Sequence, residues 1–286
     1  MNEKINQISD TAFWVSSYRA AESQRKDALF KDPFAEMLSG DKGKHFASMA
    51  SDSKYASWTV VIRTKVIDEM IDSLIKRDVE RIINLGAGLD SRPYRLELPK
   101  SLQWIEVDHD HVIQFKEEKM KNTNPNCHLQ RIGLDLSQQK ERNELFEKLN
   151  SKNLKTLILT EGVLPYLTEN QVGTLAEDLR LYSNFSYWIT EYHSRDMYKH
   201  LRNRRKNKEM ENSPFQFFPN QWIEFFNNHG WVKKELYFLN EEAKKLNRPF
   251  PLPWWAKILH ALAPKDELEK LQKMSGFVLW EPIEKE

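Results

Sequence analysis

Three acidic residues and a pair of glycines each follow a short apolar segment, and these residues are the best suited to hold a ligand. Gly86 and Gly88 follow residues 81–85, Asp108 follows 102–107, Asp135 follows 129–134 and Glu161 follows 156–160. If the apolar segments are parallel strands, their carboxyl ends meet at one edge of a sheet, where open α/β sheets bind ligands. The combination predicts a nucleotide or nucleoside site, although each residue alone would fit a turn, a helix cap or an exposed loop.

The local motif favours a nucleoside without phosphate groups. The chain contains no G-x-x-x-x-G-K-[ST] phosphate loop, and Ser91 stands at the third glycine position of a dinucleotide-binding G-x-G-x-x-G motif. Asp90 would stand beside a bound diphosphate, and two negative charges at close range repel each other. Asp108 follows the glycines at about the spacing from which a carboxylate binds ribose hydroxyls. S-adenosylmethionine, which carries an adenosine and a sulfonium but no phosphate, therefore suits this pattern.

An alternating α/β fold is needed to bring these residues together, and the apolar periodicity predicts one. Residues 55–75 repeat apolar side chains at helical spacing. The predicted strands are 81–85, 102–107, 129–134, 156–160, 185–192, 231–238 and 277–280; further predicted helices are 111–121, one that includes 145–149, one opening at the Thr168–Gln171 capping box, and one capped by Asn220 and ending near Gly230. This order predicts a doubly wound, mainly parallel sheet of the Rossmann-like class.

We expect residues 1–286 to form a single domain with a core of about 55–192 plus 220–286. Residues 1–54 and 193–219 depart from the alternation of strands and helices, because 27–44 contains short helical pieces joined by turns and 193–212 is charged with a helical pattern. We expect these two segments to form a cover with a helical lid. The basic run 202–208 fits a solvated lid helix better than a site for an acidic partner.

The composition argues against several classes of protein. The formal net charge is +1, without the basic excess of a dedicated nucleic-acid binder. The single cysteine, Cys127, allows no intrachain disulfide and suits a reducing cytoplasm. The first residues lack the apolar stretch of a secretory signal, and no run approaches the length of a membrane span. We expect a cytoplasmic monomer with no nucleic-acid or membrane partner, and no metal site at His109 and His111, which fall at a strand end.

An ordered set of short motifs resembles the leucine carboxyl methyltransferase family. The set comprises Tyr18–Ala35 (YRAAESQRKDALFKDPFA), Arg63-Thr64, Asn84–Arg92 (NLGAGLDSR), Tyr94-Arg95, Glu106-Val-Asp108 and Glu161–Tyr166 (EGVLPY). It extends over about residues 10–192 and is closest to the bacterial branch typified by the tetracenomycin polyketide methyltransferase. Ser91, where threonine is commoner, and Pro93 are mild departures. The resemblance implies a class I methyltransferase fold that uses S-adenosyl-L-methionine.

The resemblance also implies a role for each matching residue. Arg63 would hold the carboxylate of the cofactor's methionine tail with help from Arg19, and Gly86, in the turn with Gly88, would let the backbone approach the cofactor. Asp108 would bind the ribose, Asp135 and Leu136 the adenine, and Glu161 would lie near the reacting centre. The residues alone leave Arg63 open, because a guanidinium on an apolar helix face can pair with a cofactor carboxylate or with a protein carboxylate.

Methyl transfer from a sulfonium is an in-line displacement, so the protein mainly has to position the acceptor and exclude water. A carboxylate acceptor is already ionised at pH 7, whereas a hydroxyl acceptor needs a general base. The candidate bases are Tyr166, Tyr192 and His193. Trp254–Trp255 and Phe215–Phe218 fit either an apolar substrate pocket or packing between lid and core.

Three functions are compatible with the sequence. The leading hypothesis is an O-methyltransferase that acts on a carboxyl or hydroxyl group of a small, polyketide-like metabolite. The alternatives are a protein C-terminal carboxyl methyltransferase and a cofactor-binding protein without catalysis.

Overall fold

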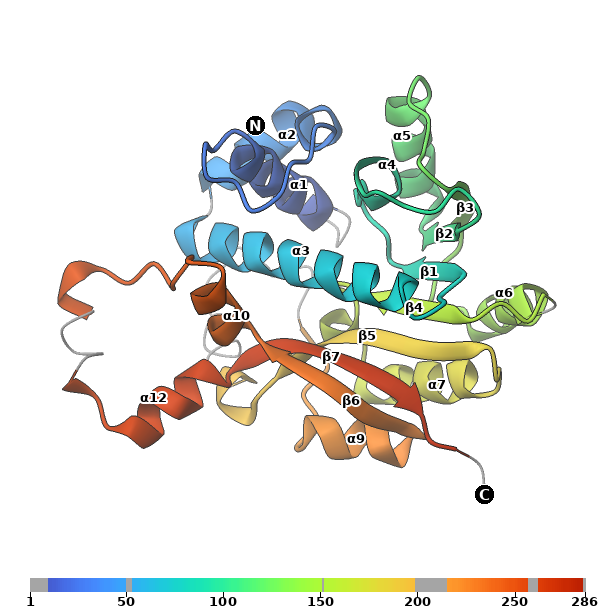
Figure 1. Ribbon diagram of the computed structural model, residues 1–286. Helices are drawn as coiled ribbons and strands as arrows, with labels where there is room; N and C mark the ends of the chain where they lie inside the picture. The colour runs from blue at the N-terminus through green and yellow to red at the C-terminus, as the bar shows by residue number, and fades with distance from the viewer. Residues whose placement is uncertain (1–9, 50–52, 151, 199–214, 257–261, 285–286) are drawn as a thin grey trace.

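Seven strands form one sheet in the computed structural model, which describes residues 10–49, 53–150, 152–198, 215–256 and 262–284 (Figure 1). The strands are β1 (Arg81–Leu85), β2 (Gln103–Asp108), β3 (His128–Gly133), β4 (Thr156–Thr160), β5 (Phe185–His193), β6 (Trp231–Phe238) and β7 (Ser275–Pro282). Their order is β3-β2-β1-β4-β5-β7-β6. The pairs among β1 to β5 are parallel, whereas β7 runs antiparallel to both β5 and β6. The predicted α/β class with a mainly parallel, doubly wound sheet is confirmed.

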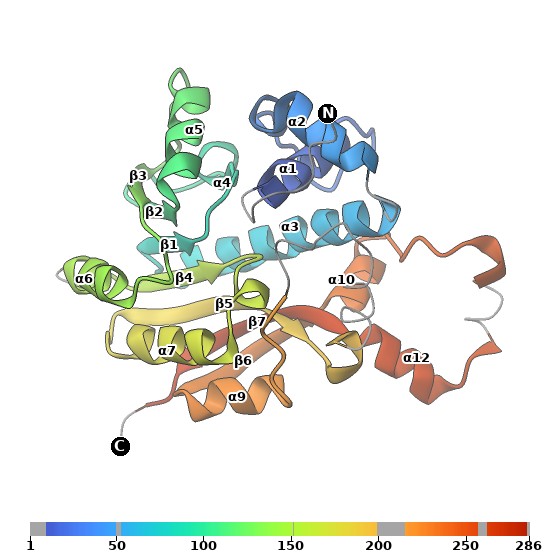
Figure 2. The ribbon, with the colours of Figure 1, turned by 180° about the vertical axis from the view of Figure 1, so that it is seen from behind.

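Helices cover both faces of this sheet. On one face, α3 (Ser53–Ile75) and α10 (Leu239–Lys245) pack with the strands in one apolar cluster (Figure 1). On the other face, α6 (Gln139–Asn150), α7 (Glu169–Arg180) and α9 (Trp222–Asn228) pack in a second cluster (Figure 2). β1 and β4 lie between the two clusters, and every residue of both strands is buried. Burial on both faces explains why the centre of each of these two strands is apolar in the sequence.

The remaining described elements are shorter or peripheral. They are α1 (Asp10–Ser23), α2 (Ala35–Met49), α4 (Arg92–Arg95), α5 (Asp110–Met120), the 3₁₀ turn η1 (Leu164–Tyr166) and α12 (Lys265–Gln272). None of the helices in the described ranges is long and apolar enough to cross a membrane.

Most predicted elements have the predicted type, and two local expectations are wrong. The Thr168–Gln171 capping box at the start of α7 is confirmed, with both reciprocal hydrogen bonds present. Asn220 does not cap α9, because the N-cap residue is Gln221 and no side-chain cap hydrogen bond forms there. His193 does not open a helix, because it ends β5 and pairs with Ser275 of β7. Residues 199–212 of the expected lid helix lie outside the described ranges.

The two N-terminal helices pack on each other above α3 (Figure 1). α2 is interrupted at Gly40, where φ is 55°, which agrees with the predicted short helical pieces. α1 approaches the loop after β1, since a Cβ atom built on Gly88 would lie 3.3 Å from the Cβ atom of Ala12. α1 therefore lies across the carboxyl edge of the sheet, next to the candidate ligand residues.

Candidate cofactor site at the carboxyl edge of the sheet

The turn after β1 requires glycine for two separate reasons. Gly86 has φ of 72°, and a Cβ atom there would lie 2.3 Å from Cγ2 of Val163. The Gly86 amide donates to the Val107 carbonyl at 2.8 Å, which fixes the turn against β2. Gly88 also has a positive φ, of 47°, and its amide donates to the Asp108 carboxylate at 2.7 Å. The turn thus brings bare backbone to the carboxyl edge and ties it to Asp108.

Asp108 and Asp135 follow neighbouring strands and lie at the same edge. Asp108 is the last residue of β2, opposite Gly133 of β3, and its second carboxylate oxygen accepts from the His109 amide at 2.7 Å. Asp135 accepts from the Ser137 amide at 2.9 Å. Burial alone would raise the pKa of Asp135, but the hydrogen bonds from Ser137 hold it below its usual value. The Asp135 carboxylate is therefore an ionised acceptor, and it precedes the half-buried Leu136.

Arg63 of α3 meets Glu161, the first residue after β4. Its Nε atom lies 2.8 Å from Oε1 of Glu161, although the N–H is not aligned for a hydrogen bond, so the contact is an ion pair. The structure thus gives Arg63 a protein carboxylate as partner. A guanidinium has five N–H donors, so one carboxylate does not exhaust it. Arg63 stays a proposed ligand for the cofactor tail.

A buried ion network behind Glu161 was not found from the sequence. Arg92 donates to Asp68 at 2.7 Å, to Asp90 at 2.9 Å and to the second oxygen of Glu161 at 2.7 Å, and Arg95 donates to both oxygens of Asp68. Burial opposes ionisation of Glu161, but Arg92 and Arg63 lower the pKa of Glu161 below its usual value. The network spans the loop after β1, α3 and the loop after β4, and sequence spacing does not reveal such long-range pairs.

The position of Asp90 weakens the expectation that this carboxylate would repel a bound diphosphate. Its carboxylate accepts from the Arg92 guanidinium and from Asn84 Nδ2, both at 2.9 Å. Because Arg92 compensates its charge, repulsion by Asp90 is a weaker reason to exclude a phosphate than the sequence suggested. The absence of a phosphate-binding motif is unaffected.

Arg19 holds the N-terminal helices to the sheet. Its Nε donates to Asp32 at 2.8 Å and its Nη2 donates to the Leu89 carbonyl at 2.6 Å, while Ser91 donates to the same Asp32 oxygen at 2.6 Å. Arg19 is 7% exposed and Asp32 is 2% exposed. The observed partners of Arg19 are thus structural ones, and a contact with the cofactor tail stays a proposal.

Two further groups, Tyr166 and Glu191, lie at the ends of β4 and β5. Tyr166 is in η1, its hydroxyl is paired with Thr11 of α1, and its ring lies 5.1 Å from the ring of Phe215. Glu191 is 5% exposed, accepts from the Gly162 amide through Oε1 and has no partner for Oε2. Burial raises the pKa of Glu191 to about 7, despite the opposing effect of Arg63. Glu191 was not predicted from the sequence, although a carboxylate in a largely apolar strand is a usable signal.

Tyr192 and His193 continue β5 beyond Glu191 and face an aromatic cluster. The ring of Tyr192 lies 6.3 Å from Trp222 and 5.8 Å from Phe238, and the ring of His193 lies 5.6 Å from Trp222. Burial raises the pKa of Tyr192 and lowers that of His193 to about 4. Both shifts disfavour the charged forms, so the two groups suit contact with an uncharged ligand more than proton transfer at pH 7.

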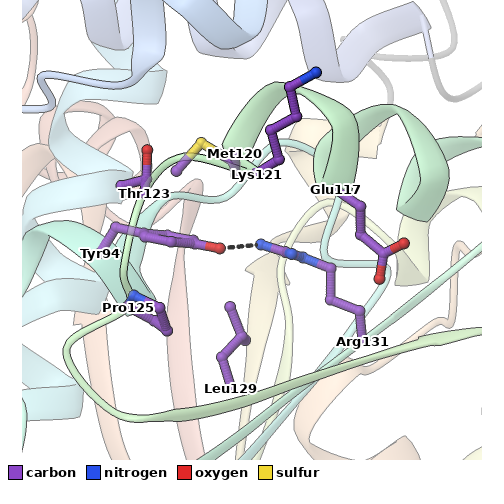
Figure 3. A pocket seen from close by; sticks show the side chains of 8 residues that line it. All are labelled: Tyr94, Glu117, Met120, Lys121, Thr123, Pro125, Leu129 and Arg131. Atoms are coloured by element: carbon purple, nitrogen blue, oxygen red, sulfur yellow. Dashed lines mark hydrogen bonds between the residues drawn. The ribbon is translucent and has the colours of Figure 1, made fainter.

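A separate hollow lies between the end of α5 and the edge strand β3 (Figure 3). It has a volume of about 310 Å³ and is lined by Tyr94, Glu117, Met120, Lys121, Thr123, Pro125, Leu129 and Arg131. Arg131 points toward the Tyr94 hydroxyl in this view and also donates to the buried Glu106 at 2.8 Å. Arg131 is already partnered by Tyr94 and Glu106, and Lys121 is paired with Glu118. The hollow is therefore not the candidate site.

The tryptophan pair and the histidine pair singled out in the sequence lie outside any enclosed or metal-binding site in the described residues. Trp254 is 75% exposed and Trp255 is 55% exposed, so neither lines an enclosed pocket. His109 and His111 stack with ring centroids 5.7 Å apart, on one side of the chain and not on opposite faces. Within the ranges that the structure describes, no group of three or more His, Cys, Asp or Glu side chains is arranged to hold a metal ion.

The order and directions of the strands are those of a class I methyltransferase fold. The family model described as "Leucine carboxyl methyltransferase" matches residues 12–180. The chain therefore belongs to the leucine carboxyl methyltransferase family. The narrower bacterial branch expected from the sequence is not distinguished by this match.

Similar curated proteins come from actinobacteria. The chain is 29% identical over 174 residues to a predicted S-adenosyl-L-methionine-dependent methyltransferase of Streptomyces coelicolor, covering 58% of this chain and 62% of that protein. It is 30% identical over 175 residues to another such protein from Saccharopolyspora erythraea, covering 57% of this chain and 59% of that protein. The chain thus spans about three fifths of the length of these relatives.

Solved structures support the fold at low sequence identity. A predicted methyltransferase from Thermobifida fusca is 14% identical with a TM-score of 0.56, over 95% of this chain and 94% of that one. Magnesium protoporphyrin IX methyltransferase from Synechocystis PCC 6803, solved with bound SAH, is 9% identical with a TM-score of 0.50. The match covers 85% of this chain and 93% of that one.

Proposed function

We propose that this protein is an S-adenosyl-L-methionine-dependent O-methyltransferase that acts on a carboxyl or hydroxyl group of a small molecule. The observation that carries the proposal is the joining of the glycine turn to Asp108 at the end of β2, through the hydrogen bond from Gly88. This arrangement puts bare backbone beside a carboxylate that would bind the ribose, in a chain of a methyltransferase family.

The charges at this edge suit a ligand that is positive at its centre. Asp108, Asp135 and Glu161 provide carboxylates, and no phosphate-binding loop accompanies them. In the proposed assignment Asp108 binds the ribose, Asp135 and Leu136 border the adenine, and the Gly86 backbone lies against the cofactor. Arg63, with Arg19 behind it, would face the carboxylate of the methionine tail.

The bound cofactor would supply an electrophilic methyl group, and the chain would position the acceptor and exclude water. Tyr166, Tyr192 and His193 are proposed to lie on the acceptor side. A carboxylate acceptor needs no base. For a hydroxyl acceptor, Glu191 has a better-matched pKa, about 7, than His193 at about 4, and its Oε2 is unpartnered.

The first test is calorimetric titration of the protein with S-adenosylhomocysteine, which binds without turnover. We expect micromolar affinity, about −8 kcal/mol, and at least about a tenfold loss in Asp108→Ala. Asp110→Asn, which changes an exposed carboxylate two residues away, is the matched control and should bind normally. A well-folded parent that does not bind would exclude the cofactor assignment.

A second assay tests transfer itself. The protein and cofactor are incubated with a panel of aromatic carboxylic acids, phenols and C-terminal peptides, and the products are weighed by mass spectrometry. A methylated small acid or phenol supports the proposal. Methylated peptide alone favours a protein substrate, and cofactor binding without any product favours a non-catalytic protein.

A further inference from the structure

A cavity of about 260 Å³ lies at the carboxyl end of β5, beyond the candidate cofactor site. It is bounded by the last residues of β5, the short helical segment 195–198 and the start of α9. The lining residues that matter for its chemistry are Tyr192, His193, Arg195, Tyr198, Trp222 and Glu224. We call it the β5 cavity.

The walls of the β5 cavity are aromatic. Trp222 lies at the centre, with ring centroids 6.3 Å from Tyr192, 6.4 Å from Tyr198 and 4.7 Å from Phe217. Edge-to-face and tilted contacts of this kind hold the rings in fixed orientations and form a firm apolar wall. Such a wall suits a flat ligand with a delocalised ring.

Three polar atoms of the lining residues are buried without a hydrogen-bond partner. They are the Tyr198 hydroxyl, the Trp222 Nε1–H and Nδ1 of His193. Tyr198 is 6% exposed and Trp222 is 4% exposed, so bulk water does not serve these groups. Buried polar groups in folded proteins are nearly always paired, and three unpaired ones around one cavity point to a ligand that pairs them.

The lining favours an uncharged ligand. Burial lowers the pKa of His193 to about 4, so its ring is neutral at pH 7. Arg195 and Glu224 are exposed, and their opposite charges balance. The Trp222 Nε1–H can only donate a hydrogen bond, so its partner on the ligand has to be an acceptor such as a carbonyl or ether oxygen.

The cavity is connected to the candidate reacting centre by a chain segment of aromatic residues. Phe215 packs on Tyr166 at 5.1 Å, Phe217 packs on Trp222 and Phe218 packs on Tyr198 at 5.1 Å. The Gln216 amide donates to the Pro165 carbonyl at 2.6 Å, which fixes this segment to η1. The segment therefore runs from the loop after β4, where Glu161 lies, to the cavity wall.

We propose that the β5 cavity receives the flat, uncharged aromatic part of the methyl acceptor, with an oxygen atom of that part accepting hydrogen bonds from Trp222 and Tyr198. The assignment of the ligand as the acceptor rests on the proposed function. The affinity of the cavity for oxygen-bearing aromatic compounds does not depend on the proposed function.

The test uses 2-acetylnaphthalene as probe and 2-ethylnaphthalene as an oxygen-free compound of similar shape. Affinities are measured by calorimetry for the full chain and for Trp222→Phe and Tyr198→Phe, which keep a ring and remove one donor. We expect the parent to prefer 2-acetylnaphthalene by about three- to tenfold and each variant to lose most of that preference. Tyr182→Phe, which removes a hydroxyl bonded to Asn143 near the start of β5, at the opposite end of that strand from the cavity, is the control.

The outcomes separate this proposal from the function on which it partly rests. Equal binding of the two naphthalenes, no binding of either, or unchanged preference in both variants would overturn it. S-adenosylhomocysteine is titrated into every protein, and its affinity should not change. If the probe binds as expected but S-adenosylhomocysteine does not bind, the proposed ligand preference of the cavity is supported and the methyltransferase proposal is contradicted. Because Trp222→Phe replaces a large buried indole by a smaller ring, thermal unfolding checks that the variant folds. Tyr198→Phe carries the test if Trp222→Phe unfolds.

Discussion

Two neighbouring glutamates at the carboxyl edge have pKa values shifted in opposite directions. Glu161 faces Arg63 and Arg92, which lower its pKa against the effect of burial. Glu191 is buried with a backbone amide as its main partner, and burial raises its pKa to about 7. A fixed anion beside a group that can exchange a proton is a common arrangement where chemistry takes place.

Glu191 should make the stability of the protein depend on pH. The folded state binds this proton more tightly than the unfolded chain, so the stabilisation is complete below the unfolded pKa, near 4.5, and is lost as pH rises through about 7. Glu191→Gln stays neutral, so its stability relative to the parent should rise by roughly 2 kcal/mol between pH 5 and pH 8. Urea unfolding at the two pH values measures this change.

The matched control for that measurement is Glu144→Gln, which changes an exposed glutamate on α6. Its stability relative to the parent should be the same at both pH values. A Glu191→Gln variant that behaves like this control would mean that Glu191 titrates near its ordinary value and is no candidate base.

At the scale of elements, α1 is attached to the sheet by a buried pair and not by apolar packing alone. Asp32 accepts from Arg19 of α1 and from Ser91 in the loop after β1, and its side chain is fully buried. The pair connects the N-terminal helices directly to the turn that contains Gly86 and Gly88. The position of α1 over the carboxyl edge therefore depends on one carboxylate.

We expect Asp32→Asn to destabilise the protein by about 3 kcal/mol, because it leaves the buried Arg19 without a charged partner. α1 should loosen first, so its amides should exchange hydrogen faster than those of α7. Denaturant unfolding and hydrogen exchange followed by mass spectrometry measure the two effects. Asp41→Asn, which changes an exposed carboxylate of α2, is the control and should change neither. Slow exchange in α1 of Asp32→Asn would show that apolar contacts suffice.

At the scale of the whole molecule, the sequence predicts strands better than it predicts the contacts between them. Residues 81–85 and 156–160 were located because burial on both faces favours apolar residues at the centre of each strand, although Arg81, Asn84 and the two threonines of β4 are also buried. The antiparallel position of β7 between β5 and β6 was not predicted, since it depends on pairing between distant segments. The partners of Arg63 and Arg92 were missed for the same reason, whereas Gly86 was predictable because its backbone conformation constrains the residue type.

Removal of β7 should abolish folding. A chain that ends at Met274 leaves β5 and β6 without their shared partner, and it loses Trp280, which is fully buried and donates to Thr190 at 2.9 Å. We expect aggregated protein with no cooperative unfolding transition, measured by solubility and by tryptophan fluorescence in urea. A chain that ends at Glu284 keeps β7 and is the control. A soluble Met274 truncation with a sharp transition would contradict the central role of β7.

The place of β7 in the sheet also bears on how the protein is made. β5 is synthesised long before β7, so on the ribosome its free edge stays open until the segment that contains β7 has emerged. At roughly 5–20 residues per second this interval is on the order of ten seconds. An open strand edge readily pairs with other chains. The yield of native protein in a cell should therefore depend on how well chaperones shield the nascent chain during that interval, more than on the stability of the finished sheet.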